Sequence, residues 1–372
     1  MSVEFIGYVS HQESSEIHLP QGPAVNPPYI AAVAQAHEYG GFDRVLIAHS
    51  SASPDGFQIA SFVAQQTRHL GILLAHRPGF VAPTLAARQL ATLDHFSAGR
   101  TAVHIISGGD DTEQQRDGDF LEHDDRYQRT NEYLDVVKRS WTSETPFDHE
   151  GTFYRVKGHR SLVRPVQKPH LPVYFGGSSE AAIQVAAKHA DVFALWGESL
   201  AQVAETIARV RAAAKPYGRE NAIRFSLSLR PIIASTEDAA WARAESILAR
   251  ATEVVKSNPN FTRRPTEPRN VGAQRLLAEA AKGTVVDKRL WTGITALTKA
   301  AGNSTSLVGT PGQVTQALIE YYRLGISTFL IRGFDPLEDA LGYGRDLLPL
   351  VHAAVAQEDS KTRKEELEAV QA

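Results

Sequence analysis

A strand, a turn and a helix follow one another in residues 171–195, which read LPVYFGGSSEAAIQVAAKHADVFAL. The apolar run Leu171–Phe175 predicts a buried strand, and Val192–Leu195 predicts the next one. Between them, Gly176-Gly177 and Ser178-Ser179 predict a tight turn, and the alanine-rich stretch that follows predicts a helix. Because a helix joins the two strands, we expect them to lie parallel in one sheet.

The same alternation extends over most of the chain. Other runs are also rich in Val, Ile, Leu and Phe and bounded by turn residues; the full set is Glu4–Val9, Arg44–Ala48, Leu70–Ala75, Thr101–Ile106, Leu171–Phe175, Val192–Leu195, Ile223–Ala234 and Thr328–Ile331. Helical patterns lie between them, such as Leu200–Lys215 after a candidate N-cap at Ser199. Tyr133, Val136, Val137 and Trp141 also recur at helical spacing. This pattern predicts an α/β fold, a single (β/α)8 TIM barrel, with a doubly wound open sheet as the alternative.

Two polar segments interrupt the alternation as insertions after strands 4 and 7. Gly108–Asp125 follows the fourth strand, and Ser257–Thr305 lies late in the chain. Because loops at the carboxyl ends of barrel strands carry the chemistry, we expect 257–305 to be a lid, with a subunit contact as the alternative. We assign residues 1–356 to one barrel domain and 357–372 to a charged, solvated C-terminal tail.

Composition excludes several classes of protein. The 372 residues are 42% hydrophobic and 22% charged, which is typical of a folded globular chain. The absence of cysteine excludes disulfides, thiolate nucleophiles and cysteine-ligated metals. A net charge of -3 gives no general case for nucleic acid or an anionic membrane. Because Met1–Tyr8 lacks the pattern of a secretory signal and no apolar run is long enough to span a bilayer, we expect a cytoplasmic protein.

Residues at the predicted strand ends could bind a cofactor, and each has a purely structural alternative. Ser178 and Ser179 suit a phosphate at a helix start, or they are simply helix caps. Ser107, before two glycines, could lie against a planar ring, or it belongs to a glycine-rich turn. Arg126 and Tyr127 could reach a phosphate from the first turn of the next helix.

The sequence offers few candidates for catalytic residues and none for metal ligands. His76 and Arg77 end the third strand, where they are candidate catalytic residues or else a hydrogen-bonded histidine and a solvated arginine. The 14 histidines show no metal-ligand spacing such as His-Glu-x-x-His, so we expect no catalytic metal. A Gly-x-Ser-x-Gly elbow is absent, which disfavours a hydrolase.

Taken together, these segments resemble the bacterial luciferase-like flavin-dependent monooxygenases, and most closely the alkanesulfonate monooxygenases. The similarity keeps its order and spacing from about residue 4 to about residue 355. The stretches that carry it are Arg77–Arg100, Ser107–Asp110, Asp117–Tyr127, Tyr174–Ser179, Leu195–Glu198 and Leu290–Gly293.

The resemblance implies a two-component enzyme. Reduced FMN (FMNH2) would come from a partner NAD(P)H-dependent flavin reductase and would react with O2 to oxygenate a small organic substrate. For a sulfonate the products would be an aldehyde and sulfite. The family also implies a homodimer or homotetramer. The FMN phosphate would bind at Tyr127, Ser178 and Ser179, beside Gly176 and Gly177, and the ring would lie near Ala75, Ser107 and Trp196.

The substrate half of the pattern departs from the sulfonate enzymes. Ser228 and Arg230 stand where those enzymes have an arginine and a histidine, and Phe334 and Pro336 stand where they have a tyrosine and a histidine. Ser53 replaces a cysteine. We expect Arg230 to grip an anionic substrate, with a structural salt bridge as the alternative. The candidate catalytic residues are Arg230, His11, His76 and Arg77.

Three other functions stay open. One is oxygenation of a sulfone or N-heterocycle with FMNH2. Another is a deazaflavin- or nicotinamide-linked oxidoreductase on the same barrel. The third is a flavin-binding protein without catalysis, against which the retained polar residues His11, His76, Arg77 and Arg230 argue.

Overall fold

The computed structural model describes residues 3–257, 268 and 270–371, and its centre is a closed barrel of parallel strands. The strand order around the barrel is β1-β14-β9-β8-β7-β4-β3-β2. The bounds are β1 Glu4–Tyr8, β2 Arg44–Ile47, β3 Gly71–His76, β4 Thr101–Ile105, β7 Val173–Gly176, β8 Val192–Trp196, β9 Arg224–Leu229 and β14 Ile326–Ile331. All the predicted runs contribute to this barrel, so the TIM-barrel prediction is confirmed and the open sheet is excluded.

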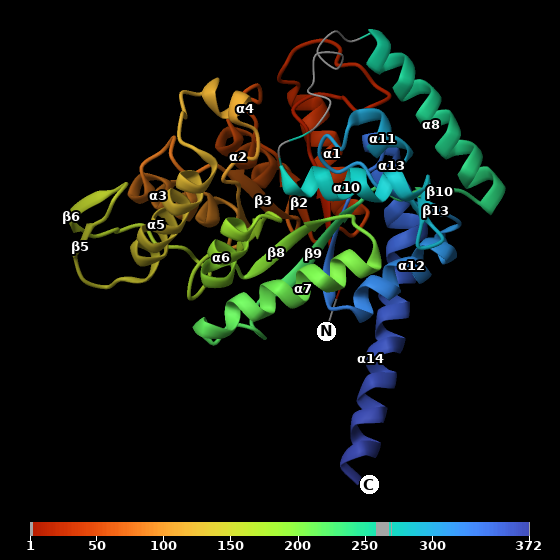
Figure 1. The fold of residues 1–372 in the computed structure, drawn as a ribbon. Helices are drawn as coiled ribbons and strands as arrows, with labels where there is room; N and C mark the ends of the chain where they lie inside the picture. The colour runs from red at the N-terminus through yellow and green to blue at the C-terminus, as the bar shows by residue number, and fades with distance from the viewer. Residues whose placement is uncertain (1–2, 258–267, 269, 372) are drawn as a thin grey trace.

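Helices surround the barrel, as the connections between parallel strands require (Figure 1). They are α1 Pro27–Tyr39, α2 Gly56–Gln66, α3 Pro83–Phe96, α5 His123–Thr142, α6 Glu180–His189, α7 Leu200–Ala214, α12 Pro311–Arg323, α13 Pro336–Gly342 and α14 Leu348–Gln371, with short η1 Lys215–Tyr217 and η2 Tyr343–Leu347. The helical stripe on α5 is buried, as its spacing predicted. Within the described part of the chain, no helix combines the length and the apolar character that crossing a membrane needs.

The run Ile223–Ala234 is not one strand, which corrects the sequence interpretation. Strand β9 ends at Leu229, and β10 (Ile232–Ile233) pairs with β13 (Ser306–Gly309) in a separate sheet. Pro231 lies at the break and has no N–H with which to continue the ladder. The amide of Arg230 donates instead to the carbonyl of Thr305 at 3.0 Å, so the chain leaves the barrel at this residue.

Both predicted insertions lie where loops leave the barrel. The first holds α4 (Asp111–Gln115), and α5 is followed by a hairpin of β5 (Phe147–Glu150) and β6 (Arg155–His159). The second follows α8 (Glu237–Ser257) and contains α10 (Val271–Lys282), β11 (Val285–Val286), β12 (Leu290–Trp291) and α11 (Gly293–Thr298). The part of the expected lid at 258–267 and 269 lies outside the described residues.

Helix α14 continues through the point at which we placed the start of the C-terminal tail. It runs from Leu348 to Gln371 and projects away from the barrel (Figure 1). The side chains of residues 360–365 are exposed, and Lys361 pairs with Glu358 one turn earlier. The charged tail therefore extends a helix whose first turns pack on the barrel through Leu348, Val351 and Val355.

Histidines buried in the fold predict instability in mild acid. Burial lowers the pKa of His37, His76 and His104 to about 4 each, from an ordinary value of 6.5. Unfolding would expose each imidazole and let it take a proton, so between pH 6.5 and pH 4 the unfolded chain binds more protons than the folded one. We expect the melting temperature to be highest above pH 6.5 and to fall steadily toward pH 4. A melting temperature that is flat down to pH 5 in scanning calorimetry would contradict this.

Candidate functional site

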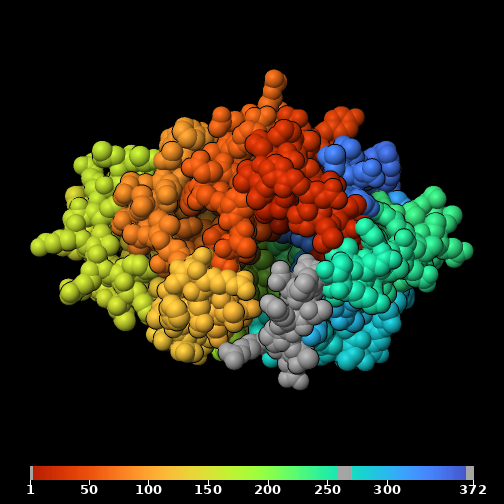
Figure 2. Space-filling model, turned by 90° about the horizontal axis from the view of Figure 1, so that it is seen from above, coloured from red at the N-terminus to blue at the C-terminus, as the bar shows by residue number. Residues whose placement is uncertain are grey.

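The carboxyl ends of the barrel strands gather the residues that the sequence singled out. His76 ends β3, Gly176 ends β7 and Trp196 ends β8. Ser107 follows β4 by two residues, and Arg230 directly follows β9. In a closed parallel barrel these positions share one rim. Figure 2 shows this face, where a hollow opens between N-terminal segments in red and orange and the residues in yellow.

A cradle suited to a phosphate lies where β7 meets α6. Ser179 is the N-cap of α6, and its hydroxyl oxygen accepts a hydrogen bond from the amide of Ala182 at 3.2 Å. Gly177 has a φ of +149°, and a β-carbon there would lie 2.6 Å from the β-carbon of Ala182. Glycine is therefore needed at position 177. The first amides of α6, which have no partner within the helix, point toward this turn.

Tyr127 closes one side of this cradle from α5. Its side chain is buried and interacts with that of Ser179. Its hydroxyl oxygen lies 3.2 Å from the place where a β-carbon on Gly177 would be. Because burial raises the pKa of Tyr127, the phenol keeps its proton and can donate a hydrogen bond to an anion. The structure thus brings together Tyr127, Gly177 and Ser179.

The start of α10 covers the other side of the cradle. A β-carbon on Gly272 would lie 3.2 Å from Cε3 of Trp196 and 3.5 Å from the hydroxyl oxygen of Ser178. A β-carbon on Gly109 would lie 3.2 Å from the β-carbon of Asn270, which is the N-cap of α10. The late insertion therefore reaches Trp196 and Ser178 through glycines that permit close contact.

A buried ion pair anchors α10 in this position. The guanidinium of Arg275 donates to both carboxylate oxygens of Glu198, with Nε–Oε1 at 3.0 Å and Nη2–Oε2 at 2.9 Å. Glu198 is only 3% exposed, and its burial raises its pKa although Arg275 opposes the shift. Because a two-pronged pair of this kind is geometrically specific, moving α10 off the rim requires breaking it.

A cavity of about 270 Å³ opens between the ends of β2 and β3. Its lining includes His49, Ser51, Ser53, Asp55, Phe57, Ala75, His76 and Arg77. Nε2 of His76 lies 2.6 Å from the hydroxyl oxygen of Tyr133. Burial, together with His49, lowers the pKa of His76, and burial also lowers that of His49. Both imidazoles are therefore neutral at pH 7, and they offer this cavity hydrogen bonds without charge.

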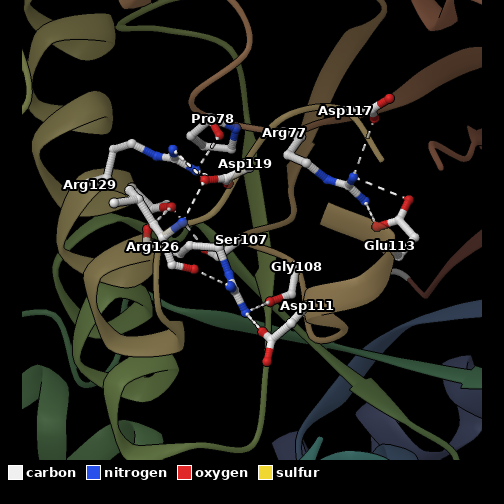
Figure 3. A network of polar contacts seen from close by, with 12 residues as sticks. Arg77, Pro78, Ser107, Gly108, Asp111, Glu113, Asp117, Asp119, Arg126 and Arg129 are labelled. Carbon is white, nitrogen blue, oxygen red and sulfur yellow. Dashed lines mark hydrogen bonds and ion pairs between the residues drawn. The ribbon is translucent and has the colours of Figure 1, made fainter. Parts of the chain in front are cut away.

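Acidic side chains of the first insertion balance the charge of Arg77. Its Nη2 lies 2.8 Å from Oε2 of Glu113, and Asp117 is 3.9 Å from Nη1 (Figure 3). Burial would raise the pKa of Glu113, but hydrogen bonds from Ser51 and from Arg77 lower it. The carboxylate is therefore ionised beside the arginine. Arg77 lines the cavity with its charge already balanced.

Two further arginines bind the same insertion to α5. Nη2 of Arg126 lies 2.7 Å from Oδ1 of Asp111, and Arg129 pairs with Asp119 through Nη2–Oδ2 at 2.5 Å (Figure 3). The charge of Arg126, which the sequence suggested could reach a phosphate, is thus balanced by Asp111. These pairs hold the segment after β4 against the rim.

Arg230 is fully buried in a salt bridge with Glu16. Its Nη1 lies 2.5 Å from Oε2 of Glu16, and its Nη2 donates to the carbonyl of Gly333 at 2.9 Å. The guanidinium carbon lies 3.6 Å from the centre of the Phe334 ring, within cation–π range. The ring of Phe334 therefore stabilises the positive charge of Arg230.

Glu16 also binds a second arginine. Nη2 of Arg332 donates to Oε1 of Glu16 at 2.9 Å. Burial would raise the pKa of Glu16, but the charges of Arg230 and Arg332 outweigh it and hold the pKa at about 2. Glu16 is thus a carboxylate at every pH at which the protein works. Sequence reasoning missed Glu16, because a lone glutamate in an irregular segment belongs to no motif.

The structure does not place His11 with the other candidate catalytic residues. Nδ1 of His11 contacts the carbonyl of Ala24, within the segment that joins β1 to α1. Neither His11 nor Arg230 is among the described residues that line the 270 Å³ cavity, whereas His76 and Arg77 are.

Gln114 is a residue of this region that sequence reasoning missed. It is fully buried, and neither atom of its amide has a hydrogen-bond partner within the described residues. Gly108 lies directly against it, since any β-carbon there would overlap the Gln114 amide. A buried amide without partners at the rim of the site indicates that a ligand or water completes its bonding.

Comparisons with known proteins identify a family and agree with the barrel fold. Residues 3–328 match the model of the luciferase-like monooxygenase family. A riboflavin lyase, solved with modified FMN and riboflavin, aligns over 95% of this chain and 92% of its own with a TM-score of 0.79 and 20% identity. An EDTA monooxygenase from Chelativorans sp. BNC1 aligns over 95% and 94%, with a TM-score of 0.73 and 20% identity. An F420-dependent secondary alcohol dehydrogenase aligns over 94% and 99%, with a TM-score of 0.69 and 16% identity. At these identities the solved structures demonstrate a shared fold.

Proposed function

The chain belongs to the family of luciferase-like monooxygenases, and on that premise we propose that it is an FMNH2-dependent monooxygenase of a small organic substrate. The observation that carries the choice of cofactor is the cradle at the start of α6. A phosphate gains there from helix amides, from the hydroxyls of Ser178 and Ser179 and from the phenol of Tyr127.

The residues of the rim fit FMN as well as its phosphate. Gly177 and Gly272 keep the cradle free of side chains, and each faces a residue assigned to flavin binding. Ser107 donates a hydrogen bond to Thr130 at 2.9 Å, which fixes its hydroxyl near the rim. The ring would lie between Ala75, Ser107 and Trp196, and the unpartnered amide of Gln114 lies against Gly108, the residue after Ser107.

Reduced FMN, when bound, supplies the two electrons with which one atom of O2 enters the substrate and the other leaves as water. The protein's own contribution is to bind, orient and exclude solvent. The Arg275–Glu198 pair holds α10 over Trp196, which limits access of water to the rim. His76 and His49, both neutral, can orient a polar substrate in the adjoining cavity.

Delivery and assembly follow the same premise. A separate NAD(P)H-dependent flavin reductase would supply FMNH2 to this chain, which would act as a homodimer or homotetramer. Residues 257–305 would act as the lid, with α10 as its part over the flavin.

The substrate class depends on the charge of the site. A sulfonate needs an available cation, but Arg77 is paired with Glu113 and Arg230 with Glu16. This observation favours the uncharged candidates, a sulfone or an N-heterocycle, over the alkanesulfonate that the resemblance suggested. Use of a deazaflavin in place of FMN remains a second candidate for the cofactor, because an F420-dependent enzyme shares the fold.

Removal of both cradle hydroxyls tests the cofactor. We expect Ser178→Ala combined with Ser179→Ala to weaken binding of FMNH2 by about 10-fold or more, since the loss of even one charge-assisted hydrogen bond, worth about 1.5–3 kcal/mol, has this effect. The affinity is measured by anaerobic titration, with FMNH2 and with a reduced deazaflavin, and Ser360→Ala on the exposed part of α14 is the control. Equal affinity of the double variant and the wild type would remove the cradle from the proposal. Tighter binding of the deazaflavin than of FMNH2 by the wild type would identify a deazaflavin as the cofactor instead.

The reaction itself is tested by turnover. Wild-type protein with FMNH2 and O2 is incubated with a sulfone, an N-heterocycle and an alkanesulfonate, and oxygenated products are measured by mass spectrometry. Product from any of them supports the monooxygenase. Binding of FMNH2 without product from any class would favour the non-catalytic flavin protein.

A further inference from the structure

The three charged residues of the Glu16 cluster come from three neighbouring strands of the barrel. Arg230 directly follows β9, Arg332 directly follows β14, and Glu16 lies in the segment after β1. Arg332 lies with its guanidinium carbon 5.1 Å from the ring centre of Tyr8, the last residue of β1. The cluster therefore belongs to the same rim as the flavin cradle at the end of β7, and β8 lies between β7 and β9 in the barrel.

The two guanidinium groups form a seat that suits one anion with two or more oxygens. Each oxygen of the Glu16 carboxylate takes one arginine, Oε2 with Arg230 and Oε1 with Arg332. Nε of Arg230 and Nε of Arg332 are both buried without a hydrogen-bond partner within the described residues. Two cations thus face one carboxylate, and the two Nε–H groups are donors without an acceptor among the described residues. A carboxylate or sulfonate from outside would meet the same donors in the same geometry.

The segment that carries Glu16 is fixed rather than free to swing. The hydroxyl of Ser15 accepts the amides of Ile17 and His18, both at 3.2 Å. Nε2 of His18 lies 2.6 Å from Oδ1 of Asp335, just beyond Phe334. Ile17 packs against the apolar cluster that contains Phe334. These contacts hold Glu16 in the seat from both sides along the chain.

We propose that Glu16 is a built-in anion that occupies the Arg230–Arg332 seat, so that the enzyme excludes sulfonates and carboxylates and acts on uncharged substrates. The statement about substrates rests on the proposed function. The occupation of the seat by Glu16 rests on the geometry alone. Glu16 is then the residue that determines substrate charge in this chain.

Chemical rescue tests the seat without any flavin. Glu16→Ala removes a fragment with the composition of acetate, and it leaves two buried cations with no partner. We expect 50 mM sodium acetate or methanesulfonate to raise the melting temperature of Glu16→Ala by several degrees over sodium chloride of equal ionic strength, because an anion that binds only the folded state stabilises it. The wild type and Glu13→Ala, an exposed glutamate on the same segment, should respond equally to all three salts.

Two results would overturn the proposal. One is a wild type that gains as much from methanesulfonate as the variant does, since its seat would then be open. The other is a folded Glu16→Ala with no response to either anion. If Glu16→Ala does not fold, Glu16→Ser, whose short side chain also vacates the seat, replaces it, and isothermal titration of methanesulfonate should show binding at least 10-fold tighter than to the wild type; equal affinity refutes the seat.

The consequence for specificity is measured separately. With FMNH2 and O2, Glu16→Ala should convert an alkanesulfonate at least 10-fold faster relative to a sulfone than the wild type does. If neither protein turns over any substrate, the proposed function fails while the rescue by acetate still stands. If rescue fails but turnover is normal, the seat is wrong and the monooxygenase survives.

Discussion

Gly177→Ala is expected to reduce the affinity for FMNH2 by about 100-fold or more, the equivalent of one or two lost charge-assisted hydrogen bonds. The added β-carbon would lie 2.6 Å from that of Ala182, in the first turn of α6, and 3.2 Å from the Tyr127 hydroxyl oxygen. A φ of +149° is also a conformation that alanine rarely adopts. The turn must move, and with it the first amides of α6 and the hydroxyl of Ser179.

The measurement is an anaerobic titration of FMNH2, accompanied by a circular dichroism spectrum. Gly312→Ala is the matched control, because a β-carbon at that position in α12 would meet no atom within 4 Å and the backbone is not strained. It should bind flavin as the wild type does. A folded Gly177→Ala that keeps wild-type affinity would show that the phosphate lies elsewhere.

The fold could be predicted because the information is repeated along the chain. Each buried strand, such as Gly71–His76 with every residue buried, is a short apolar run between turn residues, and crossover helices impose the parallel order. The predicted strand that extends furthest past the observed one, Ile223–Ala234, contains a change of pairing partner without a change of composition. Apolar residues continue on both sides of Pro231, so only the hydrogen bonding reveals where the barrel ends.

The site could be predicted only in part, and for a physical reason. The flavin half is local: Gly176 to Ser179 are consecutive, and a strand that runs into a helix places them without help from elsewhere. The charged half depends on contacts between distant segments. Glu16 meets Arg230, and Glu198 meets Arg275, with no periodicity to announce either pair. The sequence therefore identified Arg230 as a candidate functional residue, but it could not identify Glu16 as the carboxylate that neutralises it.

Arg230→Ala is expected to lower the free energy of unfolding by about 3–5 kcal/mol, which is typical when one partner of a buried ion pair is removed. Glu16 would keep only Arg332, the carbonyl of Gly333 would lose its donor, and the face of Phe334 would lose the guanidinium that covers it. The loss is measured by reversible denaturation in urea. Arg155→Ala, which breaks an exposed pair with Glu150 on the β5–β6 hairpin, should hardly change stability.

The double variant Glu16→Ala with Arg230→Ala separates the pair from its parts. If the charges support each other, the double variant loses about 1–3 kcal/mol less than the sum of the single variants, because it leaves only Arg332 without its carboxylate, whereas Glu16→Ala alone leaves both arginines so. Affinity for FMNH2 should remain near the wild-type value in all of them, since the cradle at α6 contains neither residue. Strict additivity would mean that Arg230 stabilises the fold through Gly333 and Phe334 alone. Loss of flavin binding in a folded Arg230→Ala would instead bring that arginine into the cofactor site, and the division of the rim into a flavin half and a charged half would be wrong.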